Sequence, residues 1–350
     1  MSSLDADNYV TTLAGETQPK YAFSPCDLET FGKWQSELRA AVAAALGLDK
    51  IRERPSLPLD PKLLRRDELP DHIREEYEIT TEPGFRLSFY VLRPKGNPQS
   101  PQPLVITPHG HGKDGKDTYA GIYHDEAGRR NMESGERDIA LQAVREGYLA
   151  IAPDMRGFCR NMLSADIKAG KGSSCRTMHL HALLFGRTLL GERVWDIMKV
   201  VDFALAYLDI DPKKIAITGN SGGGTASLFA AAVDPRLTIC IPSCCYCSYE
   251  ASWGAVHHCE CGYIPGIMNI ANMYDIAGLI APRPLLIVAG KDDHLAPIEE
   301  TKKAYQRTRR IYETVHAEHW CRLYIGDGGH RYYKAPVWPF VREVIASQVG

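Results

Sequence analysis

The stretch I-A-I-T-G-N-S-G-G-G, residues 215–224, decides how the rest of the chain is interpreted. Its first four residues predict a short buried strand, and the small residues after it predict a helix over Gly222–Val233. Between them, G-x-S-x-G predicts a tight turn on which a strained serine, Ser221, projects at the carboxyl edge of a sheet. The alternative interpretation is a glycine-rich phosphate-binding turn, so residues further along the chain must distinguish the two.

Other apolar runs predict strands that alternate with helices. The predicted strands are 76–80, 85–93, 104–107, 149–152, 215–218, 239–241, 285–289 and 321–325, and the predicted helices are 31–46, 138–146, 193–208 and 222–233. This alternation indicates an α/β fold with a mostly parallel sheet, buried on both faces by flanking helices. We expect one catalytic domain over residues 73–350 and an N-terminal helical extension, residues 1–72, that packs on it as a cap.

A serine nucleophile needs a base beside it, and the base needs an acid that orients it. Asp293 follows the predicted strand 285–289, and His330 follows the predicted strand 321–325. Both loops leave the carboxyl ends of strands, which is the edge where Ser221 lies. The order serine, aspartate, histidine is that of the α/β-hydrolase fold. We therefore predict a catalytic triad of Ser221, Asp293 and His330.

Neighbouring residues compete for two of these roles. The run G-K-D-D-H-L-A-P, residues 290–297, resembles the superfamily pattern G-x-x-D-x-x-x-P, which selects Asp293 and leaves Asp292 as a carboxylate of the loop. His316 and His319 precede the last predicted strand and therefore belong to the opposite edge, so we expect them on the surface.

Acyl transfer also needs donors for the developing oxyanion. We predict the backbone N–H groups of Gly222 and of His111 in the loop Pro108-His109-Gly110-His111-Gly112, which resembles the superfamily's H-G-x oxyanion loop. The alternative for this loop is a metal site, but no third ligand lies nearby in the sequence. The turn Asp154-Met155-Arg156-Gly157 predicts a structural tie between the arginine and a carboxylate.

Longer runs carry a family resemblance over about residues 75–345. They are R-V-W-D-I-M-K-V-V-D-F (193–203), D-P-K-K-I-A-I-T-G-N-S-G-G-G-T (211–225), C-G-Y-I-P-G-I (261–267) and L-I-A-P-R-P-L-L-I (279–287). They resemble the acetyl xylan esterase-like branch of the dienelactone hydrolase-related α/β hydrolases. The resemblance implies hydrolysis of a small acyl ester, with an acetylated or methyl-esterified carbohydrate as the candidate substrate. Dienelactone hydrolase itself has a cysteine where this chain has Ser221, which favours ordinary ester hydrolysis.

Two long insertions, residues 111–137 and 243–275, are expected to line the substrate pocket. In the second we predict that Tyr246, Trp253 and His258 bind substrate, since aromatic rings stack on sugars or pack against phenolic esters. The alternative is that these side chains only hold a long loop together.

The second insertion also concentrates thiols and imidazoles: Cys244, Cys245, Cys247, His257, His258, Cys259 and Cys261. Zinc is the sharpest hypothesis for such a group, but there is no C-x-x-C pair, and successive residues after a strand face opposite ways. A disulfide is a second alternative. Buried free cysteine behaves as a small apolar residue, so we expect packing thiols, with no metal and no cofactor.

Composition limits the remaining classes of function. The chain has 350 residues, 41 Lys and Arg against 43 Asp and Glu, and a net charge of −2, which gives no reason to expect nucleic-acid or membrane partners. The first residues, Met1–Asp7, lack the basic and apolar regions of a secretory signal, so we expect a cytoplasmic protein with its 10 cysteines reduced. The sequence leaves the oligomeric state open, including a homo-oligomer. A prolyl-oligopeptidase-like peptidase and a non-catalytic binding protein remain as alternative functions.

Overall fold

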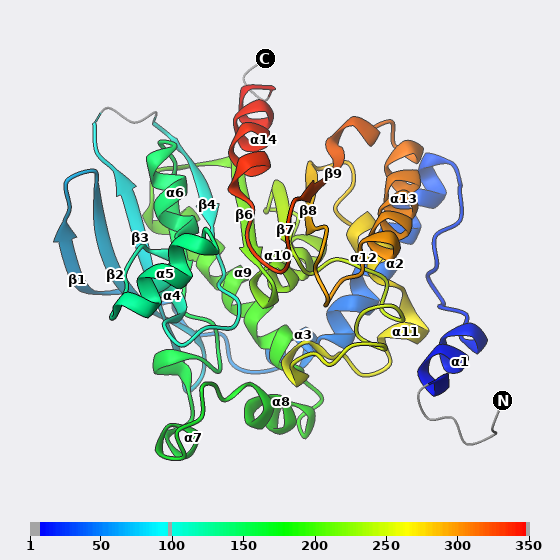
Figure 1. Ribbon diagram of the computed structural model, residues 1–350, viewed down its shortest axis with the longest axis horizontal. Helices are drawn as coiled ribbons and strands as arrows, with labels where there is room; N and C mark the ends of the chain where they lie inside the picture. The colour runs from blue at the N-terminus through cyan, green and yellow to red at the C-terminus, as the bar shows by residue number, and fades with distance from the viewer. Residues whose placement is uncertain (1–7, 97–99, 348–350) are drawn as a thin grey trace.

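In the residues that the computed structural model describes, 8–96 and 100–347, nine strands form one sheet in the order β1-β2-β3-β5-β4-β6-β7-β8-β9 (Figure 1). The strands are β1 (Lys62–Glu68), β2 (His72–Glu82), β3 (Phe85–Pro94), β4 (Gln102–Ile106), β5 (Leu149–Pro153), β6 (Ile210–Asn220), β7 (Ile239–Ser243), β8 (Leu285–Gly290) and β9 (Cys321–Gly326). β1, β2 and β3 pair antiparallel, and β3 pairs antiparallel with β5. From β5 to β9 all pairs are parallel. The predicted α/β-hydrolase fold is confirmed.

The central strands are buried on both faces, as their uninterrupted apolar runs predict. In β4, Leu104 and Ile106 belong to one apolar cluster, whereas Val105 belongs to a second cluster on the other face. Successive side chains of a strand point to opposite faces, so a run without polar residues needs a helical layer on each side.

Helices supply both layers (Figure 1). The first cluster contains side chains from α2 (Leu28–Ala45), α3 (Leu48–Arg52), α9 (Leu189–Tyr207), α10 (Gly222–Val233), α12 (Met273–Gly278) and α13 (Ile298–Thr314). The second contains side chains from α4 (Gly115–Tyr119), α6 (Ile139–Arg145) and α14 (Lys334–Ser347). The other helices are α1 (Tyr9–Glu16), α5 (Glu126–Ser134), α7 (Ser164–Lys168), α8 (Cys175–Leu183) and α11 (Ile267–Ile270). Among the helices in the described ranges, none has the length and apolarity that a membrane span requires.

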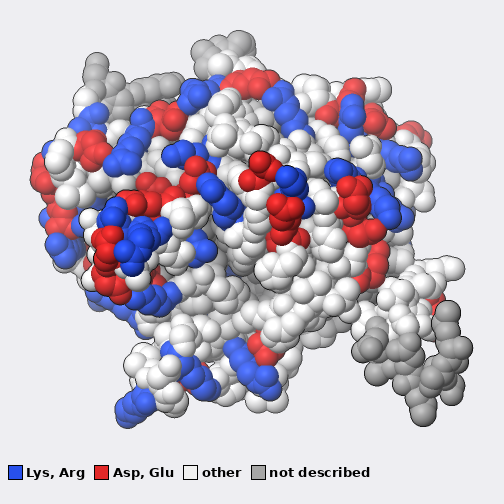
Figure 2. All heavy atoms as spheres, in the orientation of Figure 1, with Lys and Arg blue, Asp and Glu red and all other residues white. Residues whose placement is uncertain are grey.

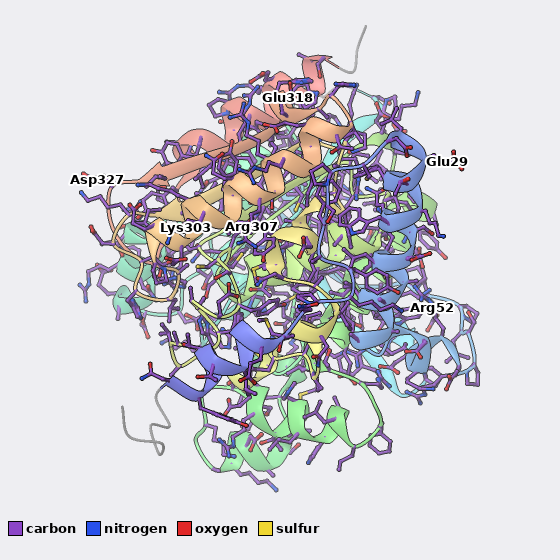
Figure 3. All side chains as sticks on the ribbon, turned by 90° about the vertical axis from the view of Figure 1, so that its right-hand side faces the viewer. Glu29, Arg52, Lys303, Arg307, Glu318 and Asp327 are labelled. Atoms are coloured by element: carbon purple, nitrogen blue, oxygen red, sulfur yellow. The ribbon has the colours of Figure 1, made fainter. Side chains whose placement is uncertain are left out.

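Helix α2, in the N-terminal extension, packs on the core and runs along one side of the molecule. In Figure 3 the label Glu29 marks its first turn, and Arg52 marks the end of α3, which follows it. Asp27 caps it by accepting the N–H of Thr30 at 2.8 Å. Leu38 and Val42 are fully buried, so α2 is part of the apolar core. The strand β1 was not predicted within the extension; it pairs with β2 and enlarges the sheet. The division into residues 1–72 and 73–350 stays a proposal, and Met1–Asp7 lie outside the described residues.

The turn after β5, residues 154–157, forms part of a buried group of charges. Its Arg156 makes the predicted tie to a carboxylate. The Arg156 guanidinium donates to both carboxylate oxygens of Asp196 at 2.7 and 2.8 Å, and to Glu82 Oε1 at 2.6 Å. Arg187 donates to the same Glu82 carboxylate at 2.7 and 3.1 Å. Although burial opposes ionisation, the hydrogen bonds from Arg187 and the charge of Arg156 hold the pKa of Glu82 at about 2. The network ties β2, α9 and the loop after β5 together.

Replacing Arg156 by alanine is expected to destabilise the protein by about 3–5 kcal/mol, because the buried carboxylate of Asp196 would lose its counter-ion and that of Glu82 would keep Arg187 but lose Arg156. Equilibrium denaturation at neutral pH measures the change. The matched control is Lys303→Ala on α13, whose ion pair with Glu300 is solvent-exposed (Lys303 is labelled in Figure 3) and whose loss should leave the midpoint unchanged. Equal stability of the Arg156 variant and the wild type would contradict this account.

Candidate active site

Ser221 sits on a strained turn between β6 and α10. Its backbone has φ 58° and ψ −125°, a conformation that a non-glycine residue rarely adopts. The neighbouring glycines are required by space: a Cβ on Gly219 would lie 2.4 Å from the carbonyl oxygen of Pro108, and one on Gly223 would lie 2.1 Å from it. The turn therefore has the strained geometry and close backbone approach that the G-x-S-x-G pattern predicts.

The loops after β8 and β9 bring an acid and a base together. His330 Nδ1 lies 2.8 Å from Asp293 Oδ2, and the other oxygen of Asp293 accepts the N–H of Leu295 at 3.0 Å. An ionised carboxylate only accepts hydrogen bonds, so Nδ1 is the donor and Nε2 is left to accept a proton. Asp293 is buried and Asp292 is exposed. The triad roles stay predictions, with Asp293 in the position that an orienting acid needs.

The rival histidines lie elsewhere. His316 follows α13 and His319 lies in the short turn before β9, and both are exposed. Sequence reasoning did not place Cys244 beside the acid and base, yet its Sγ lies within 4.8 Å of ligand atoms of Asp293 and His330. The thiol donates to the carbonyl of Arg331 at 3.0 Å, and burial raises its pKa to about 12. Cys244 is therefore a neutral thiol that supports the histidine loop.

The loop after β4 packs against the serine turn. A Cβ on Gly110 would lie 3.4 Å from Cβ of Ser221 and 3.5 Å from the backbone nitrogen of Gly222. His109 holds this loop, because its Nε2 accepts the N–H of Met155 at 2.9 Å and its Nδ1 therefore donates to the carbonyl of Gly110 at 2.8 Å. The two loop histidines thus do not chelate one ion. Gly222 opens α10, so its N–H has no partner within the helix.

A cavity of about 330 Å³ opens over these residues. Ser221, His330, His111 and Gly222 all line it, together with side chains from both predicted insertions, among them Tyr119, Arg137, Trp253 and His258. Figure 2 shows charged side chains over the upper and left parts of one face of the molecule, whereas its hollowed lower centre carries few. The residues that line the cavity include two arginines, Arg137 and Arg193.

Two of the three predicted substrate-binding residues line the cavity. Trp253 and His258 stack with ring centroids 4.1 Å apart and planes inclined by 21°, and Ser252 Oγ lies 3.0 Å from His258 Nε2. Burial, with the nearby His330, lowers the pKa of His258, which favours a neutral ring. Their role in binding stays a prediction.

The placement expected for Tyr246 is wrong. Its side chain is 1 % exposed, and its hydroxyl lies 2.7 Å from Thr308 Oγ1 on α13. The ring packs between the second insertion and α13, away from the cavity. A large aromatic residue near the start of a long loop serves here to attach that loop to the core.

Comparisons with known proteins agree with this architecture. The chain is 25 % identical, over 78 % of its length and 87 % of the relative's, to a Bacillus subtilis (strain 168) protein named "Putative hydrolase YtaP". Among solved structures, one described as a putative acetyl xylan esterase from Bacteroides fragilis NCTC 9343 matches with a TM-score of 0.76 and 21 % identity, over 92 % of this chain and 82 % of that one. The structure named Methylesterase BT1017 matches with a TM-score of 0.70 and 20 % identity, over 97 % and 68 %.

These two structural matches, at such low identity, show the shared fold. A family assignment rests instead on the sequence, where residues 3–335 match the Abhydrolase family. That match spans nearly the whole chain. It includes the turn of Ser221, the loop after β4 and the two loops that carry Asp293 and His330. The chain belongs to the Abhydrolase family.

Proposed function

We propose that this protein is a serine-dependent carboxylic ester hydrolase, with Ser221 as nucleophile, His330 as base and Asp293 as the orienting acid. The observation that carries the proposal is the 2.8 Å hydrogen bond between His330 and the buried Asp293, at a cavity that Ser221 also lines. A strained serine, a histidine with one nitrogen held by a carboxylate and a helix N-terminus beside the serine form the set that acyl transfer requires.

The chemistry follows from these positions. Ser221 Oγ attacks the ester carbonyl carbon while His330 Nε2 takes the hydroxyl proton, and the Asp293 carboxylate stabilises the imidazolium that forms. The carbonyl oxygen becomes an oxyanion, for which the N–H groups of Gly222 and His111 are the proposed donors. His330 then gives the proton to the leaving alcohol, so that an acyl-serine remains. Water repeats the sequence and releases the acid.

We propose a small acyl ester of a carbohydrate as substrate, either acetylated or methyl-esterified. The stacked Trp253–His258 pair offers a flat apolar surface beside the reacting centre, and such surfaces pack on sugar rings. The description of one structural relative as a putative acetyl xylan esterase supports an acetylated carbohydrate, and the name of the other, Methylesterase BT1017, supports a methyl ester. A cytoplasmic location and the lack of a nucleic-acid partner stay predictions.

A peptidase of the prolyl-oligopeptidase type is less well supported. The two structural relatives reported above are described as esterases, and neither is described as a peptidase. A binding protein without activity remains an outcome of the labelling experiment below.

Ser221→Ala is expected to abolish turnover of p-nitrophenyl acetate, by on the order of 10⁴-fold or more, and to abolish labelling by a fluorophosphonate probe. The fold should remain intact, since the hydroxyl is not part of the core. Ser227→Ala is the matched control: this serine lies on α10, the helix that follows Ser221, its Oγ donates to the carbonyl of Gly223, and its variant should still be labelled. A wild-type protein that resists the probe would indicate a binding protein.

Asp293→Asn is expected to lower kcat by on the order of 10⁴-fold, because an amide no longer fixes the histidine tautomer. Asp292→Asn should have only a small effect, since Asp292 is exposed and its backbone, not its side chain, is bound to the loop of Gly328. The neighbouring pair is thus its own control, measured by steady-state kinetics. A large loss of kcat for Asp292→Asn and a small one for Asp293→Asn would show that Asp292, and not Asp293, is the acid of the triad.

Short acyl groups are expected to be preferred, with kcat/KM for p-nitrophenyl acetate above that for the octanoate. This expectation rests on the resemblance to acetyl xylan esterases, which implies a small acyl group. A rate that climbs steadily from acetate to octanoate would instead indicate a lipase.

A further inference from the structure

Four potential metal ligands converge next to the proposed active site. They are His111, Cys175, Cys259 and Cys261, and their ligand atoms all lie within 4.8 Å of one another. His111 Nε2 lies 3.5 Å from the sulfur of Cys261 and 3.7 Å from that of Cys175. None of these four residues takes part in the Asp293–His330 pair, so the cluster is separate from the proposed triad.

The four residues come from three separate segments. His111 belongs to the loop after β4, Cys175 begins α8, and Cys259 and Cys261 flank the start of the short 3-10 helix Glu260–Gly262. His111 is 64 residues from Cys175 and 150 residues from Cys261 along the chain. The fold therefore assembles one imidazole and three thiols from distant parts of the sequence.

The observed separations match a tetrahedral zinc site. Zn–S bonds of about 2.3 Å and Zn–N bonds of about 2.0–2.1 Å, at tetrahedral angles, put ligand atoms roughly 3.6–3.8 Å apart. The distances from His111 Nε2 to the two sulfurs, 3.5 and 3.7 Å, agree with that spacing. Three cysteines and one histidine are a common ligand set of structural zinc.

Charge gives a second, independent reason to expect a metal thiolate here. Arg193 is buried, and its guanidinium donates to the carbonyl of Arg156 at 2.7 and 3.0 Å and to the sulfur of Cys175 at 3.2 Å. Within the described ranges, no carboxylate forms an ion pair with Arg193. A buried cation needs a counter-charge. Zinc bound by three thiolates and one neutral imidazole carries a net charge of −1, which would balance this guanidinium.

We propose that His111, Cys175, Cys259 and Cys261 bind one structural Zn²⁺ ion. Four protein ligands leave no open position for water or substrate, so the ion holds structure and does not take part in the reaction. Packing thiols were expected because the second insertion has no C-x-x-C pair, whereas the partners of Cys259 and Cys261 are His111 and Cys175 in other segments. In the structure Cys244 lies beside Asp293 and His330, Cys245 lies against the glycine turn, and only Cys259 and Cys261 join the cluster.

The zinc site would fix the wall of the cavity. His111, Cys259 and Cys261 all line it, and a Cβ on Gly222 would lie 3.2 Å from His111 Nδ1. Coordination of the imidazole therefore holds the His111 backbone beside the serine turn and ties it to the second insertion. This consequence, unlike the zinc site itself, rests on the proposed role of His111 as an oxyanion donor.

Elemental analysis of the full-length protein, purified without chelator from zinc-containing medium, tests the site. We expect about one zinc per chain in the wild type and in Ser221→Ala, and loss of most of it in Cys261→Ser and Cys175→Ser. Cys247→Ser is the matched control, because Cys247 is a buried thiol of the same insertion outside the cluster, and it should keep its zinc. Equal zinc in Cys261→Ser and the wild type would overturn the proposal.

A measurement on the unaltered protein covers the case in which the cysteine variants fail to fold. Replacement of zinc by Co²⁺ should produce intense visible bands and a sulfur-to-cobalt charge-transfer band, the signature of tetrahedral thiolate coordination. Less than a tenth of a zinc per chain, with all 10 thiols reactive after denaturation, would show packing thiols and overturn the site. Fewer free thiols, restored by a reductant, would show a disulfide and overturn it as well.

Activity separates the two proposals. If His111 is an oxyanion donor held by zinc, Cys261→Ser should lose at least about tenfold in kcat, since removal of one such donor costs about 10²–10³. Cys247→Ser should keep its activity. Stoichiometric zinc in a protein that hydrolyses no ester would leave the zinc site standing and contradict the proposed function.

Discussion

The site depends on one close contact, in which the loop after β4 presses its backbone against the turn between β6 and α10. The carbonyl oxygen of Pro108 occupies the space where Gly219 and Gly223 would otherwise carry a Cβ. This contact keeps strand, turn and helix tightly packed around Ser221, whose φ is positive, and places the loop after β4 beside it. Neighbouring parallel strands then deliver the loops of Asp293 and His330 to the same edge of the sheet.

Much of this arrangement was predictable because the decisive residues carry strong local signals. The apolar strands β4 to β9, the glycines around Ser221 and the acid and histidine after β8 and β9 all lie in short motifs next to buried strands. Burial distinguishes Asp293 from Asp292, in agreement with the spacing of the loop. These features can be predicted from local sequence because each decisive residue closely follows a strand, and the carboxyl ends of parallel strands meet at one edge of the sheet.

The features that were missed depend on contacts between distant residues. β1 reads K-L-L-R-R-D-E and is exposed along most of its length, so no apolar pattern marks it; pairing with β2 makes it a strand. Tyr246 is an aromatic residue of an insertion, but its side chain is buried in the core, where its hydroxyl is hydrogen-bonded to Thr308 on α13. Cys244, Cys245 and the pair of Cys259 and Cys261 lie at three different locations, and the partners of this pair lie far away in the sequence. Contacts of this kind join residues that are distant in the sequence, so no local sequence pattern predicts them.

The central claim is that Ser221 attacks an ester carbonyl whose oxygen is received by the backbone of Gly222 and His111. A crystal structure of the full chain after reaction with a fluorophosphonate tests it most directly, because the phosphonyl group mimics the tetrahedral intermediate. The account predicts a covalent bond from Ser221 Oγ to phosphorus, with one phosphonyl oxygen within hydrogen-bond distance of both backbone N–H groups and the His330 ring beside Oγ. An adduct on another residue, or a phosphonyl oxygen turned away from both N–H groups, would contradict it.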